Sequence, residues 1–363
     1  GVGHYTYYLV RNLLGIDKKN EYVLFFDHRF PNTKEFKQKN VKIVHFPFSQ
    51  YKKYMPYGYA HLIVSAVISR ENLDIFHAPA NTIPLSLDIP SVVTIHDLAI
   101  YKHPSWFPSK QNFSTKYLVP RSVKRAKKII AVSESTKKDL KTVFKAEPKD
   151  VEVIYEGFEK EKKISQNKIN KVKKKFRTGD NFVFYIGTVE PRKNLDLLVR
   201  AFDNLVCSDH KKYKDFKLII AGAKGWKFDK FFHEVKKVKC GRVHYINYVT
   251  HEEKVALLSS ATCFAFPSLF EGFGLPVLEA MSLGTPVITS DVSSLPEVAG
   301  KAAVLVNPKQ VKFIEKALSQ VLRLKTKRTS LIKKGKKQAK IFSWKKCARE
   351  TLKVYREVYK EVK

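Results

Sequence analysis

Residues 264–284 read FAFPSLFEGFGLPVLEAMSLG, and this single segment combines a buried strand, a glycine-containing loop and a helix. The apolar start predicts a strand that ends at Pro267, and Pro276 stands in the first turn of the helix, where proline is best tolerated. Between them, Gly272 and Gly274 let the backbone approach a ligand. The free N–H groups and the dipole at a helix start favour an anion such as a diphosphate. The segment therefore predicts a strand–loop–helix unit that binds a phosphorylated ligand.

The rest of the chain alternates short apolar strands with helices. Apolar runs without polar alternation indicate strands buried on both faces, hence a parallel sheet, and the alternation with helices indicates an α/β fold. The expected strands lie at residues 21–27, 41–46, 74–78, 91–96, 128–133, 151–155, 182–186, 216–221, 243–246, 263–267 and 286–290. The expected helices lie at residues 5–14, 134–144, 194–206, 254–260 and 276–282.

A lysine-rich stretch at residues 159–179 separates two such series of elements. Within it Ile169, Val172 and Phe176 share one helical face, so part of the stretch is a helix with a solvated side. We therefore expect two Rossmann-like domains followed by a helix that packs back on the first domain. The expected boundaries are residues 1–160, residues 161–342 and residues 343–363. Because Gly1-Val2-Gly3 stands directly before the first helix, we also expect that the first strand of the N-terminal domain is missing.

The composition describes a globular chain with a large excess of positive charge. Its 363 residues are enough for two hydrophobic cores, and 44% hydrophobic residues exclude a disordered chain. No apolar run approaches the ~20 residues that a membrane-spanning helix needs. Cys207, Cys240, Cys263 and Cys347 lie far apart without a CxxC pair, which favours free thiols in a reducing cytoplasm over disulfides or a zinc site. The net charge of +34 predicts an anionic partner or surface.

Two glutamates flank the start of the helix in the opening segment, Glu271 in the loop and Glu279 about one turn into the helix. Taken singly, a loop glutamate is usually solvated, and a glutamate near a helix start complements the dipole. Together, with seven residues between them, they resemble the E-x7-E motif of the retaining glycosyltransferases of family 4. The resemblance covers essentially the whole chain and rests on the order and spacing of several segments. These are GVGHY at residues 1–5, TIHD at 94–97, VSES at 132–135, GTVEPRKN at 187–194, the segment around Glu271 and FSW at 342–344.

The resemblance implies the GT-B fold, in which two Rossmann-like α/β domains face each other across a cleft and a C-terminal helix crosses back. It implies that Glu279 binds the ribose hydroxyls of a donor nucleotide and that Glu271 contacts the transferred sugar near the reacting carbon. It also implies that His96 meets this sugar from the first domain, while a histidine at a strand end can equally be structural. Backbone N–H groups are implied to hold the sugar and phosphate at Phe273, Gly274 and Leu275.

The same resemblance implies a diphosphate site in the loop before residue 195. Lys193 is implied to bind the leaving diphosphate with help from Arg192, and cations between a strand and a helix start suit that task. In a chain this basic, both can also be ordinary surface cations. Gly187 and Thr188 begin the loop. Many family members have arginine where Thr188 stands, so we expect phosphate binding in this chain to depend more strongly on Lys193. The resemblance implies that Gly3 approaches the diphosphate from the first domain, the alternative being an ordinary loop glycine.

The implied activity is that of a metal-independent, retaining hexosyltransferase without a cofactor. It transfers a sugar from a nucleotide-diphosphate donor to a glycan or lipid-linked acceptor in cell-envelope polysaccharide biosynthesis. GVGHYT together with TIHDL is most similar to mannosyltransferases that use GDP-mannose. A retaining family implies front-side transfer rather than the double displacement of glycosidases. The chain has no DxD-like carboxylate pair in a matching loop, so we expect no metal.

A basic and aromatic stretch between Tyr101 and Lys128 predicts an acceptor-side surface that docks on anionic lipid. Its candidate residues are Trp106, Phe107, Lys110, Lys116, Arg121, Lys124 and Arg125. This hypothesis places the enzyme in the cytoplasm, peripheral on the inner face of the plasma membrane. The alternative is a lysine bias of the whole chain with solvated side chains, since lysine is spread along the sequence.

Two other classes of function stay open. Charge alone suggests a non-enzymatic polyanion binder, which would show steeply salt-dependent binding to nucleic acid. The chain contains no recognisable nucleic-acid module, so we expect no nucleic-acid partner. Other enzymes with the GT-B fold, such as a phosphorylase or a sugar-nucleotide epimerase, form the second class, because a fold alone does not set the chemistry.

Overall fold

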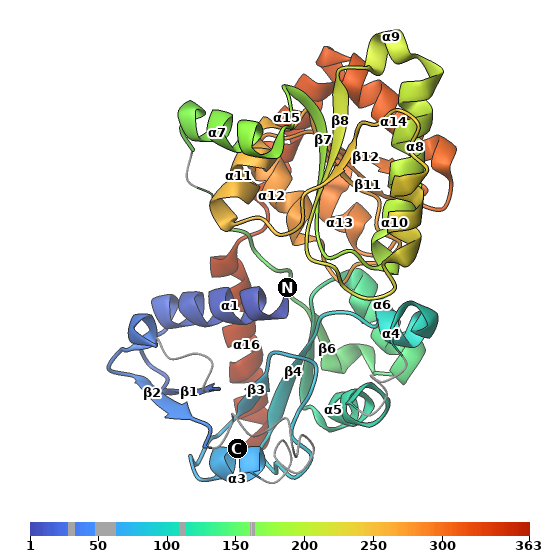
Figure 1. Ribbon diagram of the computed structural model, residues 1–363. Coiled ribbons are helices and arrows are strands. Elements are labelled where there is room, and N and C mark those ends of the chain that lie inside the picture. The colour runs from blue at the N-terminus through green and yellow to red at the C-terminus, as the bar shows by residue number, and fades with distance from the viewer. Residues whose placement is uncertain (28–32, 48–62, 109–113, 160, 162–163) are drawn as a thin grey trace. The chain divides into compact units, whose positions relative to one another are not determined.

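The computed structural model describes the whole chain except residues 28–32, 48–62, 109–113, 160, 162 and 163 (Figure 1). The described residues form two compact units. Unit 1 comprises residues 1–98, 110–157 and 344–363, and unit 2 comprises residues 99–109 and 158–343. Each unit is an α/β structure with parallel strands, which confirms the fold class predicted from the sequence.

Unit 1 contains a parallel pair of strands, β1 and β2, and a four-stranded parallel sheet in the order β3-β4-β5-β6. The strands are β1 (Tyr22–Phe26), β2 (Val41–His45), β3 (Phe76–Ala78), β4 (Ser91–Ile95), β5 (Lys128–Ala131) and β6 (Val151–Val153). The helices and helical turns are α1 (Val2–Ile16), η1 (Lys34–Phe36), α3 (Val64–Ser69), η6 (Ser114–Leu118), α5 (Val119–Arg125), α6 (Glu134–Phe144), η7 (Pro148–Asp150) and α16 (Trp344–Val362). Every residue of β4 is buried, as an apolar strand covered on both faces requires.

The C-terminal helix α16 packs against α1 within unit 1. The ring of Trp344 stacks on Tyr8 with centroids 5.5 Å apart. Further along α16, the hydroxyl of Tyr355 lies 2.6 Å from Nδ1 of His77 on β3. The chain's last helix is therefore tied to the first helix and to the sheet of the same unit.

Unit 2 has a six-stranded parallel sheet in the order β9-β8-β7-β10-β11-β12, the Rossmann arrangement in which the strand order reverses between the first and fourth strands. The strands are β7 (Asn181–Ile186), β8 (Phe216–Ala221), β9 (Val243–Tyr245), β10 (Cys263–Phe266), β11 (Val287–Ser290) and β12 (Ala303–Val306). The helices and helical turns are α4 (Ala99–Lys102), η4 (Pro104–Trp106), α7 (Gln166–Phe176), η8 (Pro191–Lys193), α8 (Leu195–Ser208), α9 (His210–Tyr213), α10 (Asp229–Lys236), α11 (His251–Ser260), α12 (Leu275–Leu283), α13 (Leu295–Ala299), η9 (Gly300–Ala302), α14 (Val311–Arg323) and α15 (Lys325–Ala339).

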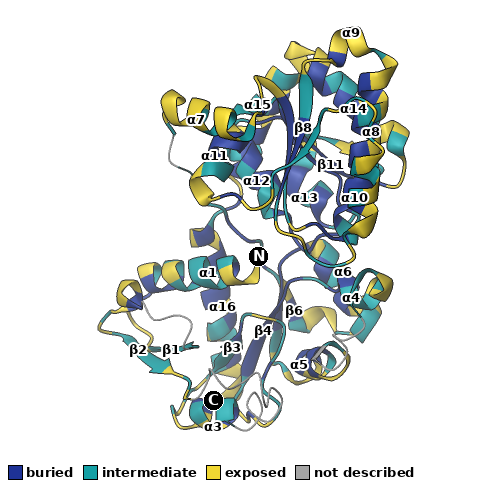
Figure 2. Cartoon of the chain, in the orientation of Figure 1, coloured by how far each residue is buried: buried dark blue, intermediate teal, exposed yellow. Residues whose placement is uncertain are grey.

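The helices of unit 2 cover its sheet in two layers. Helices α7, α11, α12 and α15 lie on one side and α8, α10 and α14 on the other (Figure 1). The central strands β7, β8, β10 and β11 are mostly buried and the edge strands β9 and β12 are more exposed, while the outer sides of the helices are exposed (Figure 2). This two-sided cover is the physical reason why the strands of unit 2 read as continuous apolar runs.

All strands expected from the sequence are present, each within two residues of its expected ends. Helix α11 begins at His251, three residues earlier than expected, because Thr250 and Glu253 form a reciprocal capping box there. Strand β12 and helices α3, α4, α5, α9, α10, α13, α14 and α15 were not among the expected elements. Among the described residues, no helix combines the length and the apolar character needed to cross a bilayer.

Two details of the N-terminal half were not evident from the sequence. Residues 99–109 group with unit 2 rather than with the rest of residues 1–160. The cause is Trp226, whose Nε1 donates a 2.7 Å hydrogen bond to the carbonyl of Trp106 and whose ring lies 5.7 Å from that of Phe107. Gly3 does not lie in a loop, because α1 already begins at Val2.

Candidate active site

The loops after β7 and β10 meet where the strand order of unit 2 reverses, which is where ligands bind in open α/β sheets. The backbone N–H of Leu269 donates to the carbonyl of Arg192 at 2.7 Å. The side-chain amide of Asn194 donates to the carbonyls of Pro267 at 3.1 Å and Pro308 at 2.7 Å. Asn194 also has a left-handed backbone, with φ of 59°. These bonds fix the loop of the EPRKN motif against the loop of the first glutamate.

Four charged side chains gather at this junction. Nζ of Lys193 lies 2.5 Å from Oε1 of Glu271, and Nη1 of Arg192 lies 2.9 Å from Oε2 of the same carboxylate. On its other side, Nε of Arg192 lies 2.5 Å from Oε1 of Glu190. Glu271, Lys193 and Glu190 are all buried. The structure thus brings together the first glutamate of the motif and both predicted phosphate cations, and it adds Glu190, whose role the sequence did not indicate.

Burial and mutual attraction pull the ionisation of this cluster in opposite directions. Burial alone raises the pKa of Glu271, but the charges of Lys193 and Arg192 and the hydrogen bond from Lys193 outweigh it and lower the pKa to about 2. Burial lowers the pKa of Lys193 against the opposing pull of Glu271. Burial raises the pKa of Glu190, which Arg192 and Lys193 only partly offset. Glu271 is therefore a firmly ionised carboxylate held by two cations.

The backbone of the glutamate loop is held by two serines that the sequence did not single out. The N–H of Glu271 donates to Oγ of Ser293 at 3.0 Å. Oγ of Ser294 donates to the carbonyls of Glu271 at 2.9 Å and Phe273 at 2.7 Å. Both serines follow β11, and nothing in their local sequence marks them, because their partners lie more than 20 residues away.

The start of α12 has the features expected of an anion site. Gly274 precedes the helix with φ of 119°, and no side chain caps the helix end. A Cβ at Gly274 would lie 2.9 Å from Cδ2 of Leu295, so glycine is needed for both conformation and space. The first N–H groups of α12, beginning at Leu275, are left without a capping side chain, as a helix end that binds phosphate requires. Phe273, just before it, is buried against the ring of Phe342 at 5.6 Å.

Glu279 lies on α12, apart from the charged cluster. Its Oε1 is 2.7 Å from Nζ of Lys254 on α11. Lys254 is a residue that the sequence analysis missed, because a single lysine in a basic chain gives no signal. The pair is half-buried, so the carboxylate is accessible while its direction is fixed.

The turn after β7 needs two glycines for close packing. The backbone of Gly187 has φ of 156°, and the carbonyl of Gly187 would lie 1.9 Å from a Cβ at Gly222. Thr188 is exposed, and its Cγ2 would lie 2.6 Å from a Cβ at Gly225. The turn is therefore pressed against the loop after β8, with Thr188 at its surface.

In unit 1, His96 sits at the end of β4 with both ring nitrogens engaged. Nδ1 lies 3.3 Å from Oε1 of Glu156, and Nε2 lies 2.8 Å from the carbonyl of Pro79. The ring of Tyr5 approaches it edge-on at 4.8 Å. Gly3, in the first turn of α1, has open space where a Cβ would stand.

The acceptor-side candidates do not form one surface in either unit. Trp106 stacks on His103 with centroids 4.0 Å apart, and Phe107 packs on Trp226, both within unit 2. In unit 1, Arg125 donates to the carbonyls of Pro84, Leu85 and Leu87, whereas Arg121 and Lys124 are exposed. Lys116 lies over the exposed ring of Tyr117 at 5.7 Å. Lys110 lies outside the described residues.

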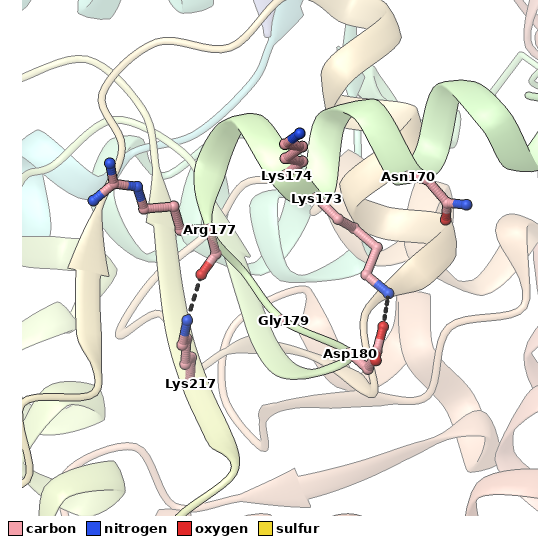
Figure 3. Close-up of a pocket in the computed structure, with 7 residues that line it drawn as sticks. All are labelled: Asn170, Lys173, Lys174, Arg177, Gly179, Asp180 and Lys217. Carbon is pink, nitrogen blue, oxygen red and sulfur yellow. Dashed lines mark hydrogen bonds and ion pairs between the residues drawn. The ribbon is translucent and has the colours of Figure 1, made fainter.

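A separate basic hollow lies at the C-terminal end of α7 and shares no residue with these loops (Figure 3). Lys173 is paired there with Asp180, and Nζ of Lys217 donates to the carbonyl of Arg177 at 2.5 Å. These contacts hold the end of α7 against β8, so two of the hollow's lysines have a structural task.

Both halves of the chain match family models. Residues 1–162 match a model described as Glycosyltransferase Family 4, and residues 166–338 match one described as Glycosyl transferases group 1. The chain is 31% identical to O-antigen chain mannosyltransferase B of Escherichia coli over 98% of this chain and 96% of that one. It is 27% identical to O-antigen chain mannosyltransferase RfbU of Salmonella typhimurium over 74% and 70% of the two chains.

Solved structures show the same fold. Sucrose-phosphate synthase from Thermosynechococcus elongatus superposes with a TM-score of 0.77 at 19% identity, over 99% of this chain and 94% of that one. Anabaena Alr3699/HepE in complex with UDP and glucose gives a TM-score of 0.73 at 18% identity, over 98% and 97%. Together with the relative that is similar over the full length, they show that the chain belongs to the family 4 glycosyltransferases of the GT-B fold.

Proposed function

We propose that this glycosyltransferase is a retaining hexosyltransferase that moves mannose from a nucleotide-diphosphate donor, GDP-mannose, to a glycan or lipid-linked acceptor in cell-envelope polysaccharide biosynthesis. The observation that carries the proposal is the buried cluster of Glu271, Lys193 and Arg192 at the point where the strand order of unit 2 reverses. The mannosyltransferases of O-antigen chains among its relatives support the sugar and the pathway class. The enzyme works in the cytoplasm as a peripheral membrane protein.

The donor is held by unit 2. Lys193 and Arg192 bind the diphosphate together with the N–H groups at the start of α12, because two cations and a helix end offer matched donors to phosphate oxygens. Glu279 accepts hydrogen bonds from the ribose hydroxyls, and Lys254 orients its carboxylate. Glu271, once released by the cations, faces the sugar.

The transfer breaks the bond between the anomeric carbon and the phosphate oxygen, and the acceptor hydroxyl oxygen forms its bond to the same face of that carbon. The bonding electrons leave with the diphosphate, which also takes the hydroxyl proton. Positive charge develops on the sugar and negative charge on the diphosphate, so Glu271 and Lys193 have the signs that stabilise both. Each well-aimed donor contributes about 3–4 kcal/mol to such a step. With two cations beside the leaving group, the reaction needs no metal.

Thermal unfolding with GDP, UDP, ADP and their sugar conjugates tests the proposal. A nucleotide at about 100 times its dissociation constant adds about 2.7 kcal/mol to the stability of the unit that binds it. For a unit of this size the midpoint then rises by several degrees. We expect GDP and GDP-mannose to raise the unfolding midpoint of the wild type, and we expect no such rise in Glu279→Ala.

The matched control is Glu315→Ala on α14, which removes a carboxylate on the other side of the sheet and is expected to keep the full shift. A shift with UDP conjugates alone would show that the donor is a UDP-sugar and not GDP-mannose. No shift with any nucleotide, combined with salt-sensitive binding to nucleic acid, would favour the polyanion binder. Transfer to inorganic phosphate instead of a glycan would favour a phosphorylase.

A further inference from the structure

Helix α15 carries a concentration of positive charge without any carboxylate. Eight of the 16 residues from Lys325 to Lys340 are lysine or arginine, and none is aspartate or glutamate. The seven lysines of this stretch form no ion pair with any described residue. The arginine, Arg328, donates to the carbonyls of Val321 and Leu322 and so closes the junction with α14.

The helix packs on α12 by one face only. Leu331, Gly335 and Ala339 are its buried residues, and a Cβ at Gly335 would lie 3.2 Å from Cγ of Met281 on α12. Lys333, Lys337 and Lys340 recur at helical spacing on the opposite face, and all three are exposed. The outer stripe of α15 is therefore a row of solvated cations that no element of unit 2 covers.

The lysines of α7 are partly compensated. Lys168 pairs with Glu252, Lys173 with Asp180 and Lys175 with Glu253 at 2.5 Å, whereas Lys171 and Lys174 form no ion pair with a described residue. The stretch around α15 differs from α7, because it contains no carboxylate and none of its seven lysines pairs with a described one.

Two large apolar side chains that flank α15 in the sequence are exposed. Leu324, just before α15, is 50% exposed, and Ile341, just after it, is 55% exposed. A cluster of lysines on a helix attracts anionic lipid headgroups, and exposed apolar side chains beside it can add contacts at the boundary of the acyl chains. Lysine lacks the bidentate geometry for reading bases, so the stretch does not favour sequence-specific binding of nucleic acid.

The C-terminal end of α15 adjoins the candidate donor site. Gly335 faces Met281 near the end of α12, while Phe342 contacts Phe273 just before the start of α12. The two helices are therefore antiparallel, and Lys340 and Ile341 lie one or two residues from a side chain packed on the glycine loop. A surface bound at this end would lie next to the loop that holds the donor.

From this geometry we propose that the outer face of α15, with Leu324 and Ile341 at its ends, docks unit 2 onto a bilayer of anionic lipids. The inference extends the proposed function, which includes a lipid-linked acceptor. It replaces the stretch between Tyr101 and Lys128 as the main lipid-binding surface, because Trp106, Phe107 and Arg125 are used for packing.

Co-sedimentation with vesicles of phosphatidylglycerol and phosphatidylcholine tests the proposal without donor or acceptor. We expect the wild type to bind phosphatidylglycerol-containing vesicles at low salt and to be released by high salt. The triple variant Lys333→Glu, Lys337→Glu, Lys340→Glu should bind roughly 100-fold more weakly, since each cation near an anionic surface is worth about a factor of five. Leu324→Ser with Ile341→Ser should weaken the binding that persists at intermediate salt.

The matched control is Lys211→Glu, Lys214→Glu, Lys236→Glu, which makes the same change of charge at exposed lysines on or beside α9 and α10, on the other side of the sheet. This control variant is expected to bind the vesicles at most a few-fold more weakly than the wild type. Equal losses of vesicle binding in both triple variants would overturn the proposal in favour of diffuse attraction by net charge. A wild type that does not bind the vesicles would also overturn it. Nucleotide binding, measured separately, should be unchanged in both variants, so a failure of the docking surface is distinguished from a failure of the donor site.

Discussion

Glu271 and Lys193 form a buried ion pair with a 2.5 Å contact between Oε1 and Nζ. Glu271 is thereby paired with Lys193, the cation that we assign to the donor diphosphate. In the free enzyme the carboxylate neutralises the buried ammonium group, which would cost several kcal/mol if it were buried without a partner. Donor binding then exchanges one anion for another and releases Glu271 toward the sugar.

This exchange predicts that Glu271→Gln tightens the binding of the nucleoside diphosphate while it abolishes transfer. Glutamine keeps the shape of the side chain but no longer competes for Lys193, so we expect affinity to rise by roughly five- to tenfold and kcat to fall by about 100- to 1,000-fold. Isothermal titration with the diphosphate and a transfer assay measure the two effects. Glu279→Gln serves as the control and should weaken binding instead. A Glu271→Gln enzyme with weaker diphosphate binding would contradict the exchange.

The depressed pKa of Glu271 predicts a loss of stability in acid. A carboxyl group whose pKa falls from 4.5 in the unfolded chain to about 2 in the folded one stabilises the fold fully above pH 4.5. That contribution is lost as the pH falls from about 4.5 toward 2, and it is on the order of 3 kcal/mol in total. Urea unfolding of the wild type and of Glu271→Gln between pH 3 and 6 measures it. The wild type should show the steeper decline, and parallel curves would show that the pair does not carry the effect.

Glu190 is predicted to position Arg192 for the diphosphate. It is 4% exposed, and its Oε1 lies 2.5 Å from Nε of Arg192, leaving Nη1 to face Glu271. We expect Glu190→Gln to raise the KM for the donor several-fold with little change in kcat, because the guanidinium loses its orientation but keeps its charge. Adding Arg192→Lys to this variant should cause a smaller loss than Arg192→Lys causes in the wild type, since both changes remove the contact between Glu190 and Nε of Arg192. Full additivity of the two would show that Glu190 acts elsewhere.

Gly222 is predicted to be indispensable for the fold of unit 2. Its φ is 141°, and a Cβ there would lie 1.9 Å from the carbonyl oxygen of Gly187, a backbone atom that cannot move aside. We expect Gly222→Ala to destabilise unit 2 by more than 3 kcal/mol or to prevent folding. The control is Gly241→Ala, where φ is also positive at 63° but the space is open, and about 1 kcal/mol is expected. Equal midpoints of thermal unfolding for the two variants would contradict this account.

Much of the fold was readable because its signals are local. The run from Phe264 to Phe266 is apolar on both faces, which is possible only for a strand covered on both sides. The helix at Glu134–Phe144 was expected with the bounds that it has, and its N-cap, Ser133, accepts a hydrogen bond from the N–H of Thr136. Strand β12 escaped notice because AVLV is too short to be told from part of a helix.

The site was readable only in part. The sequence pointed to Glu271, Lys193 and Glu279, since their spacing around a strand, a glycine loop and a helix matches a known family. It gave no sign of Ser293 and Ser294, which hold the loop across more than 20 residues, nor of Lys254, which pairs with Glu279. It also treated Trp106 and Phe107 as surface groups, whereas Trp226, more than 100 residues later, packs against both.

The sequence by itself determined the α/β class, the parallel strands and the family, because apolar periodicity, glycine positions and motif spacing are properties of short segments. Only the tertiary structure decided which charges compensate one another. It buried Glu271 between Lys193 and Arg192, gave three lysines of α7 carboxylate partners and left those of α15 without one among the described residues. The reason is that Coulombic pairing depends on distances across the fold, and residues far apart in the chain acquire those distances only when the strands and helices pack.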